Sequence, residues 1–354
     1  MMDIVGFKVP GMAESALQLA LLGSAIAITG CGGGGSSTNP SLAQRATAAT
    51  TTATANAACT SITPFYWEIG DASGSLASGT GGDGGSTPPS STTQMLIASA
   101  SKWIFSTYVV EKQSGVLSAS DIKYLNFESG YTNFSSCSTT STVSSCLSEA
   151  GTNGGTNGDY VPLTDGNFFY NGGHMQVLAN ALGMGAENNA ALAIDIKSII
   201  GTNVALAYIQ PQLAGGIYST SADYARFLRN MLDGHYSHML SLLGSNAVCA
   251  HANSTDCPTA IYSPVNQSAP GVSSNDVSDE AWHYSLGHWV EDDPSNGDGA
   301  FSSPGAFGFY PWIDQSKTYY GILARFDITH ASAGVASTFC GRLIRKAWTL
   351  GQAQ

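Results

Sequence analysis

The sequence has few charged residues, and basic residues are the scarcest. Asp, Glu, Lys and Arg make up 11% of the 354 residues, about half of their usual share of about 25%. Thirteen Lys and Arg stand against twenty-five Asp and Glu, which gives a formal net charge of −12. This charge repels a phosphate backbone, and no cluster of basic residues offers a surface for one. The composition therefore excludes a nucleic-acid partner.

Motifs of several common enzyme classes are also missing. The chain has no Gly-x-Ser-x-Gly sequence, which is the usual sign of an α/β-hydrolase nucleophile. It has no glycine-rich loop between a strand and a helix that would indicate a nucleotide site. His235 and His238 lie three residues apart but lack the acidic neighbour of a His-Glu-x-x-His zinc site. Neither a cofactor nor a metal is implied.

The apolar run Leu17–Ile28 contains 12 residues, which is too short for a membrane span but fits the core of a signal peptide. Residues 28–31 then read Ile-Thr-Gly-Cys and resemble a bacterial lipobox. We expect residues 1–31 to be a lipoprotein signal peptide and Cys31 to carry the lipid. The protein would then be exported and anchored to a bacterial membrane, on its periplasmic face or at the cell surface. The alternative is an ordinary signal peptide in which Cys31 is incidental.

Residues 32–56 consist mostly of Gly, Ser, Thr, Ala and Asn, with Arg45 as the only charge. Because they contain few large apolar groups, we expect a disordered tether here. The folded domain is then expected over residues 57–354.

The chain has seven cysteines, and if Cys31 carries a lipid, an even number remains for disulfides in an oxidising compartment. Cys137 with Cys146 and Cys249 with Cys257 form two close pairs. Neither pair has the two-residue spacing of a zinc knuckle, so we favour a disulfide within each. Six cysteines allow fifteen pairings in all.

Apolar periodicity predicts strands towards both ends of the chain and helices between them. Strands are expected over residues 61–79 (two of them), 282–290, 307–313 and 318–326. Helices are expected over residues 99–113, 174–182, 190–200, 220–231 and 334–350.

Two of the seven lysines have a serine three residues earlier, in the pairs Ser99–Lys102 and Ser120–Lys123. On a helix this offset places both side chains on one face, where a lysine with a pKa lowered by burial can take the hydroxyl proton. Ser99 begins a strongly apolar segment, whereas Ser120 lies in a polar one. We therefore predict that Ser99 is a nucleophile activated by Lys102. The alternative is that Ser99 only caps a helix.

Residues 95–103, Met-Leu-Ile-Ala-Ser-Ala-Ser-Lys-Trp, resemble the nucleophile helix of the serine β-lactamase and penicillin-binding-protein family, which includes class C β-lactamases, DD-peptidases and family VIII esterases. Residues 215–227 resemble a second stretch typical of that family, at the expected distance downstream. The resemblance implies an α/β (α+β) fold of the β-lactamase/transpeptidase type. In it, an antiparallel sheet from both chain ends is flanked by helices, and a helical lobe is inserted. It also implies that the first strand and last helix pack together, which favours a Cys59–Cys340 disulfide.

The second element of that family is a Tyr-x-Asn loop, whose tyrosine completes a proton relay. This chain has Phe169-Tyr170-Asn171 in the corresponding stretch. Because a phenol is required, we expect Tyr170 to be catalytic and Asn171 to lie near the substrate. The alternative is that these aromatic residues belong to the core.

The third element is Lys or His, any residue, and Gly. The matching stretch here is Ser303-Pro304-Gly305, so a serine stands in place of the cation. We expect Ser303, Gly305 and Ala306 to contact substrate, and the backbone amides of Ser99 and Ala306 to form an oxyanion hole. The alternative is a simple turn before a strand.

Together these residues predict a serine hydrolase that forms an acyl-enzyme on small-molecule or peptide-like esters or amides. Without a cation at position 303, we expect it to resemble an esterase more than a true β-lactamase. Two alternatives stay open: an envelope binding protein of this fold with impaired catalysis, or a β-lactamase or DD-peptidase.

Overall fold

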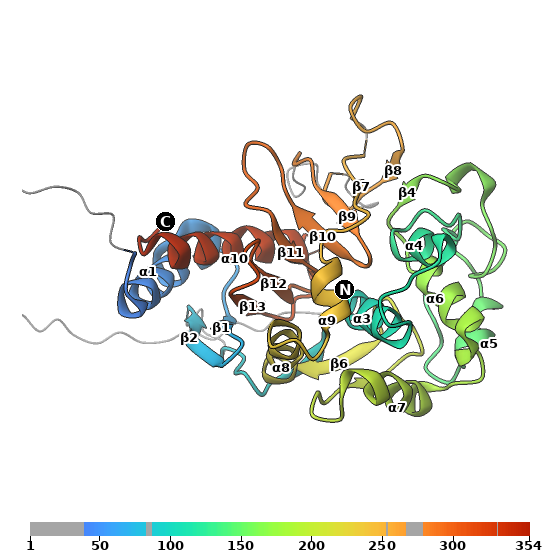
Figure 1. Cartoon of the computed structure of the whole chain (residues 1–354), viewed down its shortest axis with the longest axis horizontal. Coiled ribbons are helices and arrows are strands. Elements are labelled where there is room, and N and C mark those ends of the chain that lie inside the picture. The colour runs from blue at the N-terminus through green and yellow to red at the C-terminus, as the bar shows by residue number, and fades with distance from the viewer. Residues whose placement is uncertain (1–38, 83–86, 253, 267–278, 331) are drawn as a thin grey trace, which may run out of the picture. The chain divides into compact units, whose positions relative to one another are not determined.

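An antiparallel sheet of eight strands joins the two ends of the folded chain (Figure 1). Its strand order is β2-β1-β13-β12-β11-β10-β9-β7. The strands are β1 (Phe65–Asp71), β2 (Gly74–Gly81), β7 (Val248–Cys249), β9 (His283–Ser285), β10 (His288–Glu291), β11 (Ala300–Ser302), β12 (Tyr310–Ile313) and β13 (Tyr320–Ala324). Because β1 pairs with both β2 and β13, the first and last strands share one layer, as the sequence predicts.

The computed structural model describes residues 39–82, 87–252, 254–266, 279–330 and 332–354. The predicted signal peptide with Cys31, and residues 32–38 of the predicted tether, lie outside this part of the chain. None of the described helices is both long and apolar enough to cross a membrane.

The predicted tether is wrong for residues 41–55, since Leu42–Ala55 form helix α1. Ser41 and Gln44 form a capping box at its start, and Arg45 Nη1 donates a 2.9 Å hydrogen bond to the Trp348 carbonyl. The buried side chains are small: Ala48, Ala49, Thr52 and Ala53. The folded unit therefore begins at Pro40 and not at residue 57. Small side chains allow α1 to pack closely against its neighbours and become buried. A count of large apolar residues in the sequence does not detect this kind of burial.

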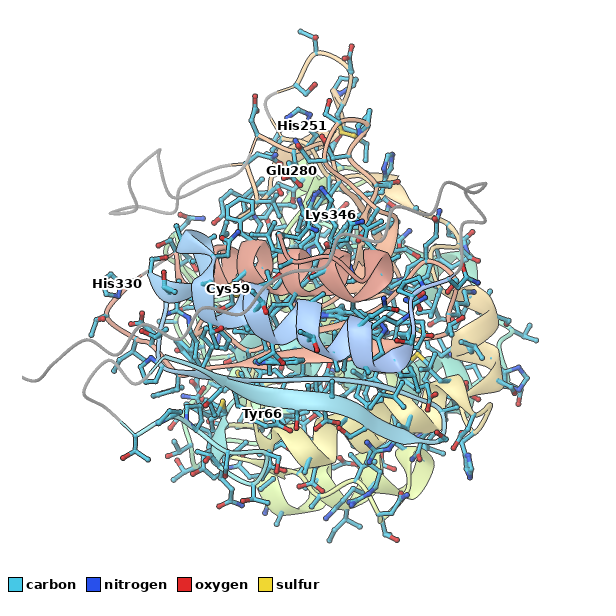
Figure 2. All side chains as sticks on the ribbon, turned by 90° about the vertical axis from the view of Figure 1, so that its left-hand side faces the viewer. Cys59, Tyr66, His251, Glu280, His330 and Lys346 are labelled. Carbon is cyan, nitrogen blue, oxygen red and sulfur yellow. A yellow bond between two sulfur atoms is a disulfide. The ribbon has the colours of Figure 1, made fainter. Side chains whose placement is uncertain are left out.

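Helix α10 (Ala333–Leu350) packs beside α1 and the short α2 (Ala57–Thr60). Figure 2 shows α1 and α10 side by side over this face, with Cys59 close to them. A hydrophobic core beneath them includes Phe65, Trp67, Tyr310, Trp312 and Trp348.

The helical lobe lies between β3 and β7 in the sequence, as predicted. Its helices are α3 (Ser101–Lys112), α4 (Ala119–Leu125), α5 (Val143–Leu147), α6 (Gly173–Ala179), α7 (Asn189–Ile200), α8 (Ser221–Leu232) and α9 (Ser237–Leu242). Two smaller sheets accompany them. One contains β3 (Gln94–Leu96), β6 (Ile217–Thr220) and β5 (Ala207–Tyr208), in that order. The other contains β4 (Phe168–Phe169) and β8 (Ala260–Tyr262). The first ten residues of α3 are buried, so this helix forms the centre of the larger core.

The favoured disulfides are confirmed. They join Cys59 to Cys340, Cys137 to Cys146 and Cys249 to Cys257. The first links two residues 281 positions apart and connects α2 to α10.

Candidate active site

Ser99 lies on a single helical turn, η1 (Ala98–Ala100), between strand β3 and helix α3. Ala98, the residue before it, has φ = 44°, a left-handed conformation that is uncommon for a non-glycine residue. Neighbouring elements hold this turn: Ile97 N donates to the Ile217 carbonyl at 3.1 Å, and the Tyr224 hydroxyl to the Ala100 carbonyl at 2.9 Å. Ser99 is therefore presented on a fixed backbone, and it is not the N-cap of either helix: Ile97 caps η1 and Ala100 caps α3, both without a side-chain hydrogen bond.

Lys102 is the polar partner of Ser99. Its Nζ lies 2.8 Å from Ser99 Oγ and 2.8 Å from the carbonyl oxygen of Ala214. The side chain is buried, and burial lowers its pKa from the usual 10.5 to about 7. A substantial fraction of Lys102 is therefore neutral near pH 7, in the form that can accept the Ser99 proton.

Tyr170, and not Phe169, reaches this pair. Lys102 Nζ lies 4.8 Å from the centroid of the Tyr170 ring, and Tyr170 lines the same cavity as Ser99. Burial raises the pKa of Tyr170 well above its usual value, so it keeps its proton at neutral pH. Phe169 instead packs against Tyr262, with ring centroids 5.3 Å apart.

His174, which the sequence does not mark as part of the site, fixes the backbone next to Tyr170. Its Nε2 donates to the Phe169 carbonyl at 3.0 Å, while Nδ1 accepts from the Ser129 hydroxyl at 2.7 Å. Burial lowers its pKa to about 3, so the ring is neutral and this tautomer is retained. His174 therefore positions Tyr170 without contacting the cavity.

The sequence predicts that Asn171 lies near the substrate, but Asn171 does not line the cavity. Its Nδ2 donates to the Phe134 carbonyl at 3.1 Å, and its Oδ1 accepts from Gly173 N at 2.9 Å. The amide thus links the start of α6 to the segment that contains Phe134.

Ser303 is also turned away from the cavity. Its Oγ donates to the backbone carbonyl of Ser99 at 3.1 Å. Two further bonds, Ser303 N to Pro311 O (3.2 Å) and Gly305 N to Phe309 O (2.7 Å), extend the pairing of β11 and β12 beyond the named strands. The expected contact between the Ser303 side chain and substrate is therefore replaced by a contact with the backbone of the nucleophile.

Gly305 and Ala306 do line the cavity, as expected. A Cβ atom at Gly305 would lie 2.2 Å from the carbonyl oxygen of Ile97, so only glycine permits this approach to the nucleophile turn.

The cavity beside Ser99 has a volume of about 140 Å³ and a largely apolar lining. The lining residues are Ser99, Tyr170, Pro264, Val265, Trp282, Trp289, Pro304, Gly305, Ala306, Gly334, Val335, Thr338 and Phe339. Within the described chain, this lining includes no Asp, Glu, Lys, Arg or His. The described residues also contain no group of three or more His, Cys, Asp or Glu side chains placed to hold a metal.

Comparison of the sequence with models of protein families gives no match, and comparison with curated proteins gives none either. Solved structures do match. Unliganded simvastatin synthase from Aspergillus terreus has a TM-score of 0.54 and 12% identity, over 87% of this chain and 97% of that one. A β-lactamase from Mycobacterium bovis has a TM-score of 0.51 and 13% identity, over 82% and 96% of the two chains. A D-stereospecific amidohydrolase from a Streptomyces species has a TM-score of 0.50 and 12% identity, over 89% and 100%.

This chain has the β-lactamase fold. In this chain's version of the β-lactamase fold, Ser99 lies on the η1 turn before α3, Tyr170 lies in the helical lobe, and Gly305 follows strand β11 of the main sheet. The cavity accordingly lies where the lobe and the sheet meet, as the resemblance implies. The aromatic lining residues Trp282 and Trp289 and the α10 residues were not predicted, because nothing in their local sequence places them near Ser99.

Proposed function

We propose that the protein is a serine hydrolase that forms an acyl-enzyme at Ser99 and acts on uncharged esters or amides. The observation that carries this proposal is the 2.8 Å contact between Ser99 Oγ and a buried Lys102 whose pKa is about 7. A fully charged lysine could not remove the serine proton, whereas a neutral amine at this distance can.

In the first half of the reaction, Lys102 Nζ takes the proton of Ser99 Oγ as the oxygen bonds to the substrate carbonyl carbon. The backbone amides of Ser99 and Ala306 are the candidate donors to the resulting oxyanion. Tyr170 gives its proton to the departing alcohol or amine and regains one from Lys102. The products of this half are the free leaving group and an acyl ester on Ser99.

In the second half, water attacks the acyl ester and releases a carboxylic acid. The neutral amine of Lys102 takes the water's proton, and Tyr170 gives its proton to Ser99 Oγ as the acyl bond breaks and regains one from Lys102. Within the described residues, no carboxylate lines the cavity to act as a separate base. The same two residues therefore serve both halves.

The apolar lining supports an uncharged substrate. A charge-assisted hydrogen bond to a substrate carboxylate contributes about 1.5–3 kcal/mol, roughly ten- to a hundredfold in binding. Position 303 supplies no such cation, and the net charge of −12 further disfavours anions. Two fold neighbours are named as a β-lactamase and an amidohydrolase, which supports a hydrolase without choosing the substrate.

The test compares kcat/KM for p-nitrophenyl butyrate and a chromogenic cephalosporin on the same preparation. We expect kcat/KM for the ester to exceed that for the cephalosporin by about tenfold or more. Tenfold is roughly the low end of the binding advantage that a cation at position 303 would give a substrate carboxylate. Ser99→Ala and Lys102→Met should abolish the ester turnover. A cephalosporin that is better by about tenfold would show that another residue holds a carboxylate.

We also propose that the protein is exported and lipid-anchored at Cys31. The Ile-Thr-Gly-Cys sequence supports this, and three disulfides suit an oxidising compartment. Since the folded unit begins at Pro40, the intervening chain can reach no more than about 30 Å. Cys31→Ser should release the protein from the membrane fraction. An intact mass that shows cleavage elsewhere, with Cys31 unmodified, would contradict the anchor.

A further inference from the structure

One face of helix α10 closes the cavity beside Ser99. Val335 and Phe339 are four residues apart on this helix, so they lie on the same face, and both line the cavity. Phe339 is half-buried. Side chains of the last helix of the chain therefore form part of the cavity wall.

A second and larger hollow continues along the same helix. It is a groove of about 730 Å³ between α10 and the loops that join β10 to β11 and β12 to β13. Phe339 also lines this groove, together with Arg342, Leu343 and Lys346 from the following turns of α10. In the described part of the chain, Phe339 is the one residue that the two linings share. Its side chain therefore forms a partition between the cavity and the groove.

Trp282, which stands next to this partition, is held firmly. Its Nε1 donates to Glu280 Oε2 at 2.7 Å, and the guanidinium of Arg342 lies 5.2 Å from the centroid of its ring. Arg342 in turn pairs with Glu280 at 2.8 Å. These contacts fix the indole, which lines the cavity but not the groove, whereas Phe339 lines both.

The two hollows differ in chemistry. The cavity has an uncharged lining, whereas the groove is bordered by charged residues such as Arg342, Arg345 and Asp298, which are paired with carboxylates or with each other. A long apolar chain bound at Ser99 would meet the Phe339 ring first and a polar surface beyond it. Both features limit how far an apolar group can extend.

We propose that Phe339 determines the length of the apolar group that the site accepts, by closing the cavity against the groove. This inference rests on the proposed acyl-enzyme at Ser99. A cavity of about 150 Å³ holds one benzene molecule, so the volume of about 140 Å³ admits one substituent of about six carbons. The substituent is the acyl or the alkoxy group of an uncharged ester.

The test measures kcat/KM for p-nitrophenyl esters from acetyl through butyryl, hexanoyl and octanoyl to decanoyl. A parallel series of alkyl acetates varies the alkoxy group instead. In the wild type, kcat/KM should rise by about fourfold per buried methylene and fall beyond hexanoyl. Phe339→Ala should move the maximum to octanoyl or longer in one series. The series that responds identifies the group in the cavity, and either response supports the proposal.

Two variants control the experiment. Leu343→Ala shortens a side chain that lines the groove but not the cavity, so the wild-type length profile should persist. Val335→Phe fills the cavity from the same face of α10 and should move the maximum towards acetyl. Fluorophosphonate labelling of Ser99 in each variant shows that the site is folded.

A labelled Phe339→Ala enzyme with the wild-type profile in both series would overturn the proposal. If Val335→Phe left the profile unchanged, the assignment of the cavity as the binding site would also be wrong. A folded wild type that is neither labelled nor active on any ester would refute the proposed function itself, and this inference would fall with it.

Discussion

Ser303 Oγ donates a 3.1 Å hydrogen bond to the backbone carbonyl of Ser99. The contact joins the end of strand β11 in the main sheet to the turn that carries the candidate nucleophile, across 204 positions of sequence. The family pattern predicts a lysine or histidine at this position. In this chain the position is a serine, which bonds to the backbone of Ser99 and carries no charge.

The first prediction concerns Ser303. Ser303→Ala removes one neutral hydrogen bond, for which about 0.5–1.5 kcal/mol is typical, so kcat should fall by about two- to tenfold with little change in KM. Ser303→Lys should raise the cephalosporin-to-ester ratio of kcat/KM by about tenfold or more, because it restores a cation. A thermal melt confirms that each variant is folded. An unchanged ratio in a folded Ser303→Lys protein would show that the missing charge does not determine selectivity.

The second prediction concerns the pH dependence of activity. If neutral Lys102 is the base, kcat/KM for a neutral ester should increase with pH through an apparent pKa near 7. Lys102→Met should reduce the rate by about a hundred- to ten-thousandfold. A flat profile from about pH 6 to 9 would contradict Lys102 as the titrating base.

The third prediction is that the same lysine lowers stability. Its pKa is about 7 in the folded state and near 10.5 in the unfolded chain, so between these values the unfolded state binds more protons. The free energy of unfolding should therefore rise with pH from about 7 to 10, and below about pH 7 the full destabilisation remains. That shift corresponds to on the order of 5 kcal/mol. Lys102→Met should be more stable than wild type at about pH 6, with a smaller difference at about pH 10. Equal urea midpoints at both pH values would refute this.

The proximity of the candidate catalytic residues could be predicted because their signals are local. Ser99 and Lys102 are three residues apart across the junction of η1 and α3, and Tyr170 supplies the phenol that a proton relay needs. The structure brings these three together. The roles of Asn171 and Ser303 could not be predicted, since each depends on partners far along the chain: Phe134 for one and the Ser99 carbonyl for the other.

The fold was predictable from the resemblance of residues 95–103 and 215–227 to the family's motifs, but the start of the folded unit was not. Helix α1 is rich in threonine and alanine, which have little apolar area, and its burial depends on the matching surface of α10. Trp282, Trp289 and Phe339 meet at one cavity only after the sheet and the last helix are assembled. The spacing of residues along the chain does not predict which distant side chains meet at this cavity.

The fourth prediction tests that helix. Ala49 is completely buried in α1, whereas its neighbour Thr50 is exposed. Ala49→Asp places an unpaired carboxylate in the contact with α10 and should reduce the free energy of unfolding by about 3 kcal/mol or more. Thr50→Asp, the matched control, should change it by no more than about 0.5 kcal/mol. Equal chemical denaturation curves for the two variants would show that residues 42–55 do not belong to the folded unit.

The central claim is that Ser99 is a nucleophile activated by Lys102, and covalent labelling tests it most directly. The wild-type protein, Ser99→Ala and Lys102→Met are each treated with a fluorophosphonate probe, after circular dichroism has shown that all three are folded. The intact mass and the modified peptide are then measured. We expect one adduct on the wild type at Ser99, none on Ser99→Ala, and labelling of Lys102→Met slowed by about a hundredfold or more. A folded wild type that remains unlabelled, or an adduct on a residue other than Ser99, would contradict the account and favour a binding protein of this fold.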